Sequence, residues 1–165
     1  HNVAFGLKLR DYPRKEREEI VRKHISLVGL EGFEEKYPYQ LSGGMKQKVA
    51  LARILALNPE IILMDEPFAS LDAQTRLIFQ RDFSGLWSEM KKTVVFVTHD
   101  IEEAIFLGTR VLIMTPRPGT ISESHVVDFP CPREHELRVS PEFVSLKFKI
   151  FSSLQTAIQG GATNG

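Results

Sequence analysis

The chain has 165 residues, of which 42% are hydrophobic and 25% are charged, as is typical of a globular domain with its own apolar core. Its 21 basic and 21 acidic side chains balance, which argues against a nucleic-acid partner or an anionic lipid surface. No apolar run approaches the ~18 residues of a membrane span. No signal peptide is recognisable and Cys131 is the only cysteine, so we expect a cytoplasmic protein.

The first forty residues are predicted to be mainly helical. A helix should begin at Pro13, which suits a first turn, and should stop at Gly29. A second short amphipathic piece is expected over residues 30–36. An extended segment should follow it, because Pro38 disfavours helical backbone at the preceding residue.

Two adjacent glycines follow Ser42 at the start of the next predicted helix, which should end near Pro59. Ser42 can cap this helix. Capping does not require Gly43 and Gly44, each of which costs about 1 kcal/mol relative to alanine inside a helix. Because glycine has no side chain, backbone N–H groups and the positive end of the helix dipole can approach an anion. The pattern therefore predicts a phosphate-binding helix N-terminus.

An apolar run at residues 61–64 is typical of a buried parallel strand, and it ends at two adjacent carboxylates, Asp65 and Glu66. In open α/β sheets, ligands bind beyond the carboxyl ends of the strands. Two acids placed there can divide the work. One can order Mg²⁺ through its water shell, while the next polarises an attacking water.

Asp72 is placed to cap a long helix over residues 73–90, whose aromatic residues recur at helical spacing and are assigned to the core. A β-branched run over residues 93–98 predicts another buried parallel strand, which delivers His99 to the carboxyl edge of the sheet. The remaining predicted elements are a helix at 101–107, a strand at 110–114, a hairpin strand at 120–127 and a closing helix from Ser140.

Four segments together resemble the ATP-binding subunits of ABC transporters. Residues 42–47 (SGGMKQ) resemble the signature motif of that family, and residues 61–66 resemble its Walker B strand with the catalytic glutamate. Residues 70–72 are similar to the D-loop, and His99 is similar to the switch histidine. The four motifs occur in the order and spacing of the family, and the resemblance covers nearly the whole chain.

The resemblance implies a partial P-loop NTPase fold of the ABC ATPase type, an α/β fold with a mostly parallel sheet flanked by helices. Residues 1–40 would be part of its helical subdomain. Residues 41–139 would carry the signature, Walker B, D-loop and switch-histidine part of the ATPase core. Residues 140–159 would form the C-terminal helix and 160–165 a disordered tail. No Gly-rich Walker A loop and no glutamine loop is found before the signature, so we expect a fragment of a longer domain.

The implied reaction is ATP hydrolysis by in-line attack of water, with ATP and Mg²⁺ as ligands. By resemblance, Glu66 would orient and partly deprotonate the water, Asp65 would order Mg²⁺ and His99 would hold the γ-phosphate. In the family a signature reaches the nucleotide of the opposite subunit in a head-to-tail dimer. The nucleotide-binding residues expected here are Ser42, Gly43, Gly44, Gln47 and Asp72.

The family also implies partners: a transmembrane permease subunit, a second ATPase subunit and, indirectly, a periplasmic or extracellular solute-binding protein. The protein would lie on the inner face of the cell membrane. Residues 67–76 and the turn at 116–119 are most similar to the nitrate, sulfonate and taurine importer branch, which takes up small anions. The isolated chain should be inactive, because a phosphate loop supplies much of the ATP affinity.

Two alternatives remain open. An ABC-type ATPase of DNA repair or chromosome organisation shares the signature and the Walker B chemistry. Such chains lead to the signature through long coiled coils or clamp segments, whereas a compact stretch without a basic stripe precedes it here. The other alternative is a non-catalytic partner, which would supply only a signature to the nucleotide of another subunit.

Overall fold

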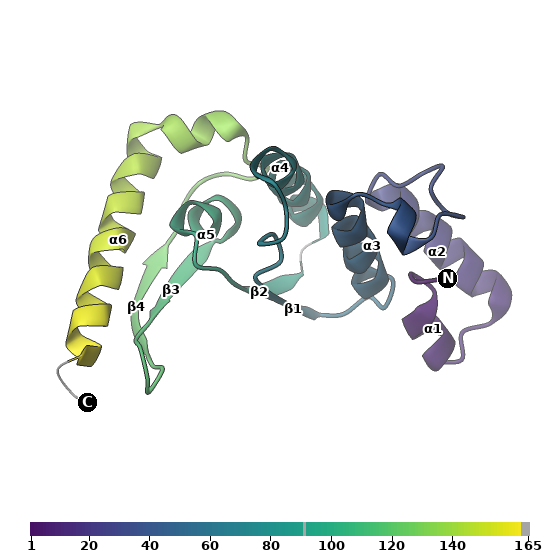
Figure 1. Cartoon of the computed structure of the whole chain (residues 1–165), viewed down its shortest axis with the longest axis horizontal. Helices are drawn as coiled ribbons and strands as arrows, with labels where there is room; N and C mark the ends of the chain where they lie inside the picture. Colours follow the sequence, from purple (N-terminus) through teal and green to yellow (C-terminus); the bar gives the residue numbers. More distant parts are fainter. Residues whose placement is uncertain (91, 163–165) are drawn as a thin grey trace. The chain divides into compact units, whose positions relative to one another are not determined.

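The computed structural model describes residues 1–90 and 92–162 (Figure 1). No helix in these residues is long and apolar enough to cross a membrane. The chain divides into two compact units, and the division falls within helix α4 (Ala73–Met90). The N unit comprises residues 1–79 and 90–97, and the C unit comprises residues 80–89 and those from Thr98 on.

Residues 1–60 of the N unit form helices joined by turns and short irregular segments. Helix α2 (Arg14–Leu27) begins after Pro13 and ends before Gly29, which has a φ of 64°, so the predicted helix is confirmed. The piece predicted over residues 30–36 forms turns instead, because Gly32 is also left-handed (φ 84°) and leaves too few residues between the breaks to nucleate a helix. The other elements of this region are α1 (Phe5–Leu9), the 3₁₀ helix η1 (Pro38–Gln40) and α3 (Gly43–Leu55).

The predicted extended lead-in to the signature is only partly right. Tyr37 is extended, as expected for a residue before proline, but the next three residues form η1. The side chain of Gln40 accepts a hydrogen bond from the Tyr37 N–H at 2.8 Å, which closes this turn directly before α3.

The sheet of the N unit consists of β1 (Ile61–Asp65) and β2 (Thr93–Val97), which pair in parallel along their whole length. One face carries Ile62 and an aromatic cluster in which the ring of Phe68 lies 5.3 Å from Phe79 and 6.4 Å from Phe96. The prediction that both strands are buried is wrong for the other face. Alternate residues point away from this cluster, and four apolar side chains there are more than half exposed: Ile61, Leu63, Val95 and Val97.

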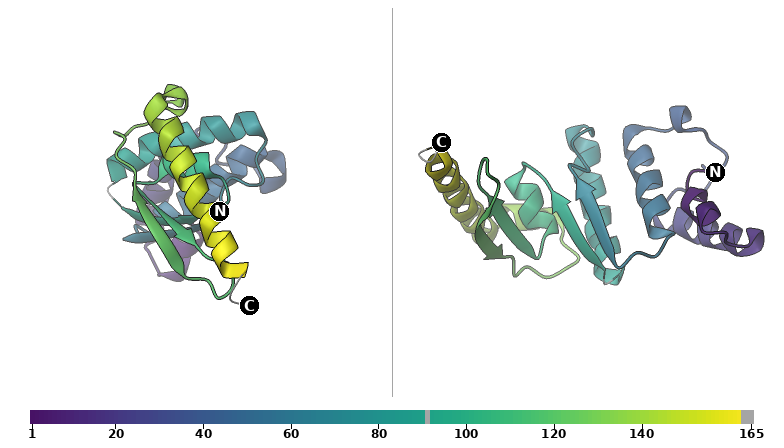
Figure 2. Two further views of the ribbon diagram at one scale, coloured as in Figure 1. Left: turned by 90° about the vertical axis from the view of Figure 1, so that its left-hand side faces the viewer. Right: turned by 90° about the horizontal axis from the view of Figure 1, so that it is seen from below.

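The C unit packs a helix pair against an antiparallel hairpin. Its elements are α5 (Ile101–Leu107), β3 (Arg110–Met114), β4 (Ile121–Val126), the 3₁₀ helix η2 (His135–Val139) and α6 (Pro141–Ala162). Figure 2 shows α6 lying along the hairpin, against which its apolar side chains pack. The buried core of this unit consists of Ile105, Phe106, Val111, Ile113, Val127, Phe143, Ile150 and Ala157.

Helix α6 runs three residues beyond its predicted end at residue 159. Of the tail predicted to be disordered, residues 160–162 therefore belong to the helix, and residues 163–165 lie outside the described part of the chain. The extension lengthens α6 by less than one turn and does not change the architecture.

Candidate functional site

The signature segment forms the capped N-terminus of α3. The Oγ of Ser42 accepts a hydrogen bond from the Met45 N–H at 3.3 Å, so the predicted cap is confirmed. Gly43 is exposed, and a Cβ added there would meet only Leu71 Cδ2 at 3.6 Å, an ordinary contact. An anion therefore has access to the backbone at Gly43.

Gly44 has a different environment. It is buried, and a Cβ at this position would lie 2.7 Å from Cγ2 of Thr75, in the first turn of α4. The absence of a side chain at Gly44 thus lets α3 pack closely against α4. The sequence pattern suggested only the phosphate role for this glycine, because the contact with Thr75 joins residues far apart in the chain.

Residues 70–72 connect to both helices of this region. The Nε2 of Gln47 donates to the Oγ of Ser70 at 3.5 Å, which links α3 to the loop. Asp72 caps α4 by accepting the Thr75 N–H at 2.9 Å, as predicted. Hydrogen bonds from the side chain and then the backbone of Thr75 hold the pKa of Asp72 below its usual range. Arg76, which the sequence did not point to, donates to the Leu71 carbonyl at 2.9 Å and fixes the loop from inside.

The two acids leave the carboxyl end of β1 with exposed side chains. The Glu66 N–H donates to the Val97 carbonyl at 2.9 Å, so the pairing with β2 continues one residue beyond Asp65. Glu66 has a φ of 43°, a left-handed conformation that costs a residue with a Cβ about 1–2 kcal/mol. Such strain concentrates at functional sites, where the surrounding structure holds it. Here β2 holds it by pairing with the strained residue.

His99 is exposed and lies in the C unit, directly after Thr98, where the second segment of that unit begins. Its neighbours fix the backbone on both sides. The Oγ1 of Thr98 accepts the Asp100 N–H at 3.0 Å, and Oδ1 of Asp100 accepts the N–H groups of Glu102 and Glu103 at 2.9 and 3.2 Å. The histidine therefore lies in an ordered turn at the N-terminus of α5. The sequence analysis did not predict this cap, although an acid directly before a helical pattern is a signal that could have identified it.

The described residues contain no group of three or more His, Cys, Asp and Glu side chains suited to a metal ion. A magnesium ion in a nucleotide site needs less, because it retains several waters and is bound by one or two carboxylates together with substrate phosphates. The exposed carboxylate of Asp65, an oxygen ligand at the end of a strand, fits that requirement.

A family model described as "ABC transporter" matches residues 2–69. An uncharacterised ABC transporter ATP-binding protein of Methanocaldococcus jannaschii is 54% identical over 157 residues, which cover 95% of this chain and 58% of that protein. The chain belongs to the ABC transporter ATP-binding family. The predicted resemblance is thereby confirmed.

Two further relatives of this chain are named for the solute that they import. The taurine import ATP-binding protein of Rhizobium johnstonii is 44% identical over 160 residues, covering 94% of this chain and 61% of that protein. The nitrate import ATP-binding protein of Synechocystis is 39% identical over 168 residues, covering 98% of this chain and 62% of that protein. The chain thus spans 58% to 62% of the length of these three relatives.

A solved structure confirms the fold class. The structure of cbiO1 from Clostridium perfringens, described as part of the ABC transporter complex cbiONQ, matches with a TM-score of 0.69 and 24% identity. The match covers 90% of this chain and 55% of cbiO1. The α/β arrangement of a parallel sheet with flanking helices is therefore the fold that cbiO1 has.

Proposed function

We propose that the protein containing this chain is the ATP-binding and ATP-hydrolysing subunit of an ABC importer. The observation that carries this proposal is the pair of exposed acids at the carboxyl end of β1, where Glu66 is held in a strained left-handed conformation by its bond to β2. A glutamate that served only to solvate the surface would not need a costly backbone conformation fixed by a neighbouring strand.

The chemistry follows from the groups present. Glu66 orients the attacking water and takes up part of its proton, as a carboxylate within hydrogen-bond reach can do. His99 donates to the γ-phosphate, and the ordered turn around it limits the motion of its backbone. Asp65 would hold Mg²⁺, and the bound ion would supply positive charge beside the phosphates.

The signature completes the site from a second subunit. We propose that Ser42 and the N–H groups at Gly43 and Gly44 face the γ-phosphate held by the opposite copy in a head-to-tail dimer. In the same unit Gln47 binds Ser70 and Asp72 caps α4, and we propose that both contribute to the same surface. Gly44 has no side chain and packs closely against Thr75, so its proposed contribution to phosphate binding is its backbone N–H.

The proposed setting is the inner face of a cell membrane. The partners are a permease subunit, a second ATPase subunit and, through the permease, a solute-binding protein. The names of the taurine and nitrate import relatives support uptake of a small anion such as nitrate, a sulfonate or taurine. Transport by vesicles containing the permease, assayed with each labelled anion in turn, identifies the solute.

The chain by itself is proposed to be inactive. A phosphate loop supplies several charge-assisted hydrogen bonds of about 1.5–3 kcal/mol each. Micromolar to millimolar affinity for a nucleotide corresponds to only about −8 to −4 kcal/mol in total. Without that loop, a fluorescent ATP analogue should show no saturable binding to the 165-residue chain at micromolar concentration. Saturation in that range would contradict this part of the proposal.

The decisive experiment replaces Glu66 in the full-length protein. Glu66→Gln keeps the size of the side chain and its hydrogen-bonding oxygen but removes the base, so ATP hydrolysis should fall about 10² to 10⁴-fold while ATP binding remains. Glu60→Gln is the matched control, because Glu60 is an exposed glutamate directly before β1. Normal turnover by the Glu66 variant would refute the proposed function.

A further inference from the structure

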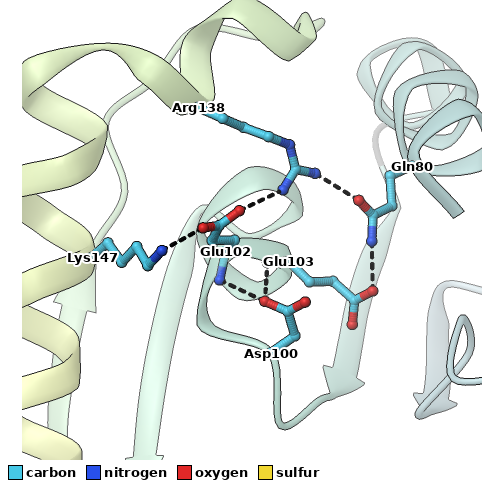
Figure 3. A network of polar contacts seen from close by, with 6 residues as sticks. All are labelled: Gln80, Asp100, Glu102, Glu103, Arg138 and Lys147. Carbon is cyan, nitrogen blue, oxygen red and sulfur yellow. Dashed lines mark hydrogen bonds and ion pairs between the residues drawn. The ribbon is translucent and has the colours of Figure 1, made fainter. Parts of the chain in front are cut away.

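Side chains from three other elements of the C unit converge on the first turn of α5 (Figure 3). We call this group the α5 clamp. In this group the two glutamates and the carbonyl oxygen of the glutamine each pair with a nitrogen donor of another member. The members are Glu102 and Glu103 on α5, Gln80 on α4, Arg138 on η2 and Lys147 on α6.

Arg138 is the centre of the α5 clamp. Its Nη2 donates to Oε1 of Gln80 at 2.6 Å, and its Nη1 lies 3.5 Å from Oε2 of Glu102. Gln80 in turn donates from Nε2 to Oε1 of Glu103 at 2.7 Å, and both of these side chains are buried. One guanidinium therefore holds two adjacent glutamates, Glu102 directly and Glu103 through Gln80. The fixed fork of arginine donors permits this, whereas a lysine ammonium is a single point of charge.

The environment of Arg138 keeps the arrangement rigid. Only 14% of its side chain is exposed, and its guanidinium lies over the ring of Phe106 at 4.2 Å from the centroid. Burial lowers the pKa of the guanidinium, although it stays charged at physiological pH. Lys147 adds a second ion pair to Glu102 from α6. In this partly dry environment, charge-assisted hydrogen bonds are stronger than on the surface.

The α5 clamp acts on the turn that carries His99. The backbone N–H groups of Glu102 and Glu103 bind the Asp100 carboxylate, while their side chains bind the clamp. The first turn of α5 is thus fixed at its backbone and at its side chains (Figure 3). Asp100 directly follows His99 and is also bound, through its N–H, to Thr98. Any rotation of this turn would reorient the backbone at His99 and therefore the direction of its side chain.

We propose that Arg138 is a positioning residue for His99, and that the C-terminal segment carrying Arg138 and Lys147 is required for ATP hydrolysis although it contains none of the motifs of the ATPase. This inference rests on the proposed role of His99. In this inference Arg138 has no direct role toward nucleotide or water. It acts by fixing the helix turn that presents the histidine to the γ-phosphate.

The test uses the full-length protein and Arg138→Gln. We expect kcat for ATP hydrolysis to fall at least 10-fold with KM changing less than 2-fold, and the imidazole NMR signals of His99 to shift. Arg138→Lys should restore only part of the rate, because it cannot hold Glu102 and Gln80 together. Arg81→Gln is the control. Arg81 lies on α4 in the same unit and is about half exposed, and its guanidinium pairs with the adjacent Asp82. It should change neither kcat nor the His99 signals.

A double variant separates positioning from general destabilisation. If Arg138 acts through His99, then adding Arg138→Gln to His99→Ala should lower the remaining rate less than 2-fold. The inference would be overturned if the Arg138→Gln protein had a kcat within 2-fold of the parent. It would also be overturned if kcat fell while the His99 signals stayed unchanged. Glu102→Gln serves where Arg138→Gln fails to fold, and should shift the same signals. Normal hydrolysis by His99→Ala would instead overturn the proposed function.

Discussion

Gly44 offers a test that separates packing from phosphate binding. In Gly44→Ala the new Cβ would lie 2.7 Å from Thr75 Cγ2, about 1 Å closer than an ordinary carbon–carbon contact. Thr75 cannot simply rotate, because its side chain and backbone both bind Asp72. The start of α4 must therefore move away from α3.

The expected magnitude follows from two opposing terms. Overpacking of this kind typically costs about 1–3 kcal/mol. Replacing glycine by alanine in a helix contributes up to about 1 kcal/mol in the other direction. We expect a net loss of about 1–2 kcal/mol, measured as a lower urea midpoint of the full-length protein. Thr75→Ser removes the methyl group and keeps the hydroxyl, so the Gly44→Ala/Thr75→Ser double variant should recover most of the lost stability.

Activity is then compared with stability in the same variants. Gly43→Ala is the matched control, because its Cβ meets only Leu71 Cδ2 at 3.6 Å. Its stability should stay within about 0.5 kcal/mol of the parent. Its ATPase activity should fall if the exposed glycine lets a phosphate approach the backbone. A Gly44→Ala protein as stable as the parent would refute the packing argument, and a fully active Gly43→Ala protein would refute the access argument.

Two further predictions concern the C unit. Arg133 is buried and donates to the carbonyl groups of four residues, three of them at the end of α5. Arg133→Met should leave these carbonyl groups without their donor. We expect this variant to lower the free energy of unfolding by at least about 2 kcal/mol. Urea unfolding measures this loss, and Arg110→Gln, an exposed arginine on β3, should change stability by less than about 0.5 kcal/mol. The hydrogen bond from Lys147 is the largest cause that holds the pKa of Glu102 below its ordinary value, so the stabilisation by this pair is complete at neutral pH and is lost as the pH falls through the lowered pKa. The stability difference between the parent and Glu102→Gln should therefore be larger at pH 7 than at about pH 3, and a difference that grows toward acid would contradict this assignment.

Local signals predicted much of this fold. Ser42 and Asp72 were recognised as caps because the residue type and the start of an apolar helical pattern lie within a few positions of each other. The limits of α4 were predicted residue for residue for the same reason. The strand at 61–64 was recognised from its composition, although its exposed face was not, since a run of apolar residues does not say what covers each side.

The side-chain contacts that support the candidate site could not be predicted from the sequence, because the residues that they join are far apart along the chain. Arg138 meets Gln80 across 58 positions, and Arg133 meets the carbonyl groups of α5 across 25 to 28. Neither arginine stands in a motif or at a position of a periodic pattern that would single it out. Periodicity reports which face of an element is apolar, but it does not report which polar side chain another element contributes.

The motif residues and the residues that support them therefore differ in how they could be found. Glu66 was predicted as a site residue from its place after an apolar strand, but its left-handed backbone is maintained by Val97, from a strand that begins 27 positions later. The same holds for His99, whose turn is fixed locally by Thr98 and Asp100 and then braced by Arg138 from the C-terminal segment. A motif specifies the reacting groups. The precision of their placement comes from pairing and burial elsewhere in the chain, which is why substitutions outside the motifs are the sharper test of the mechanism.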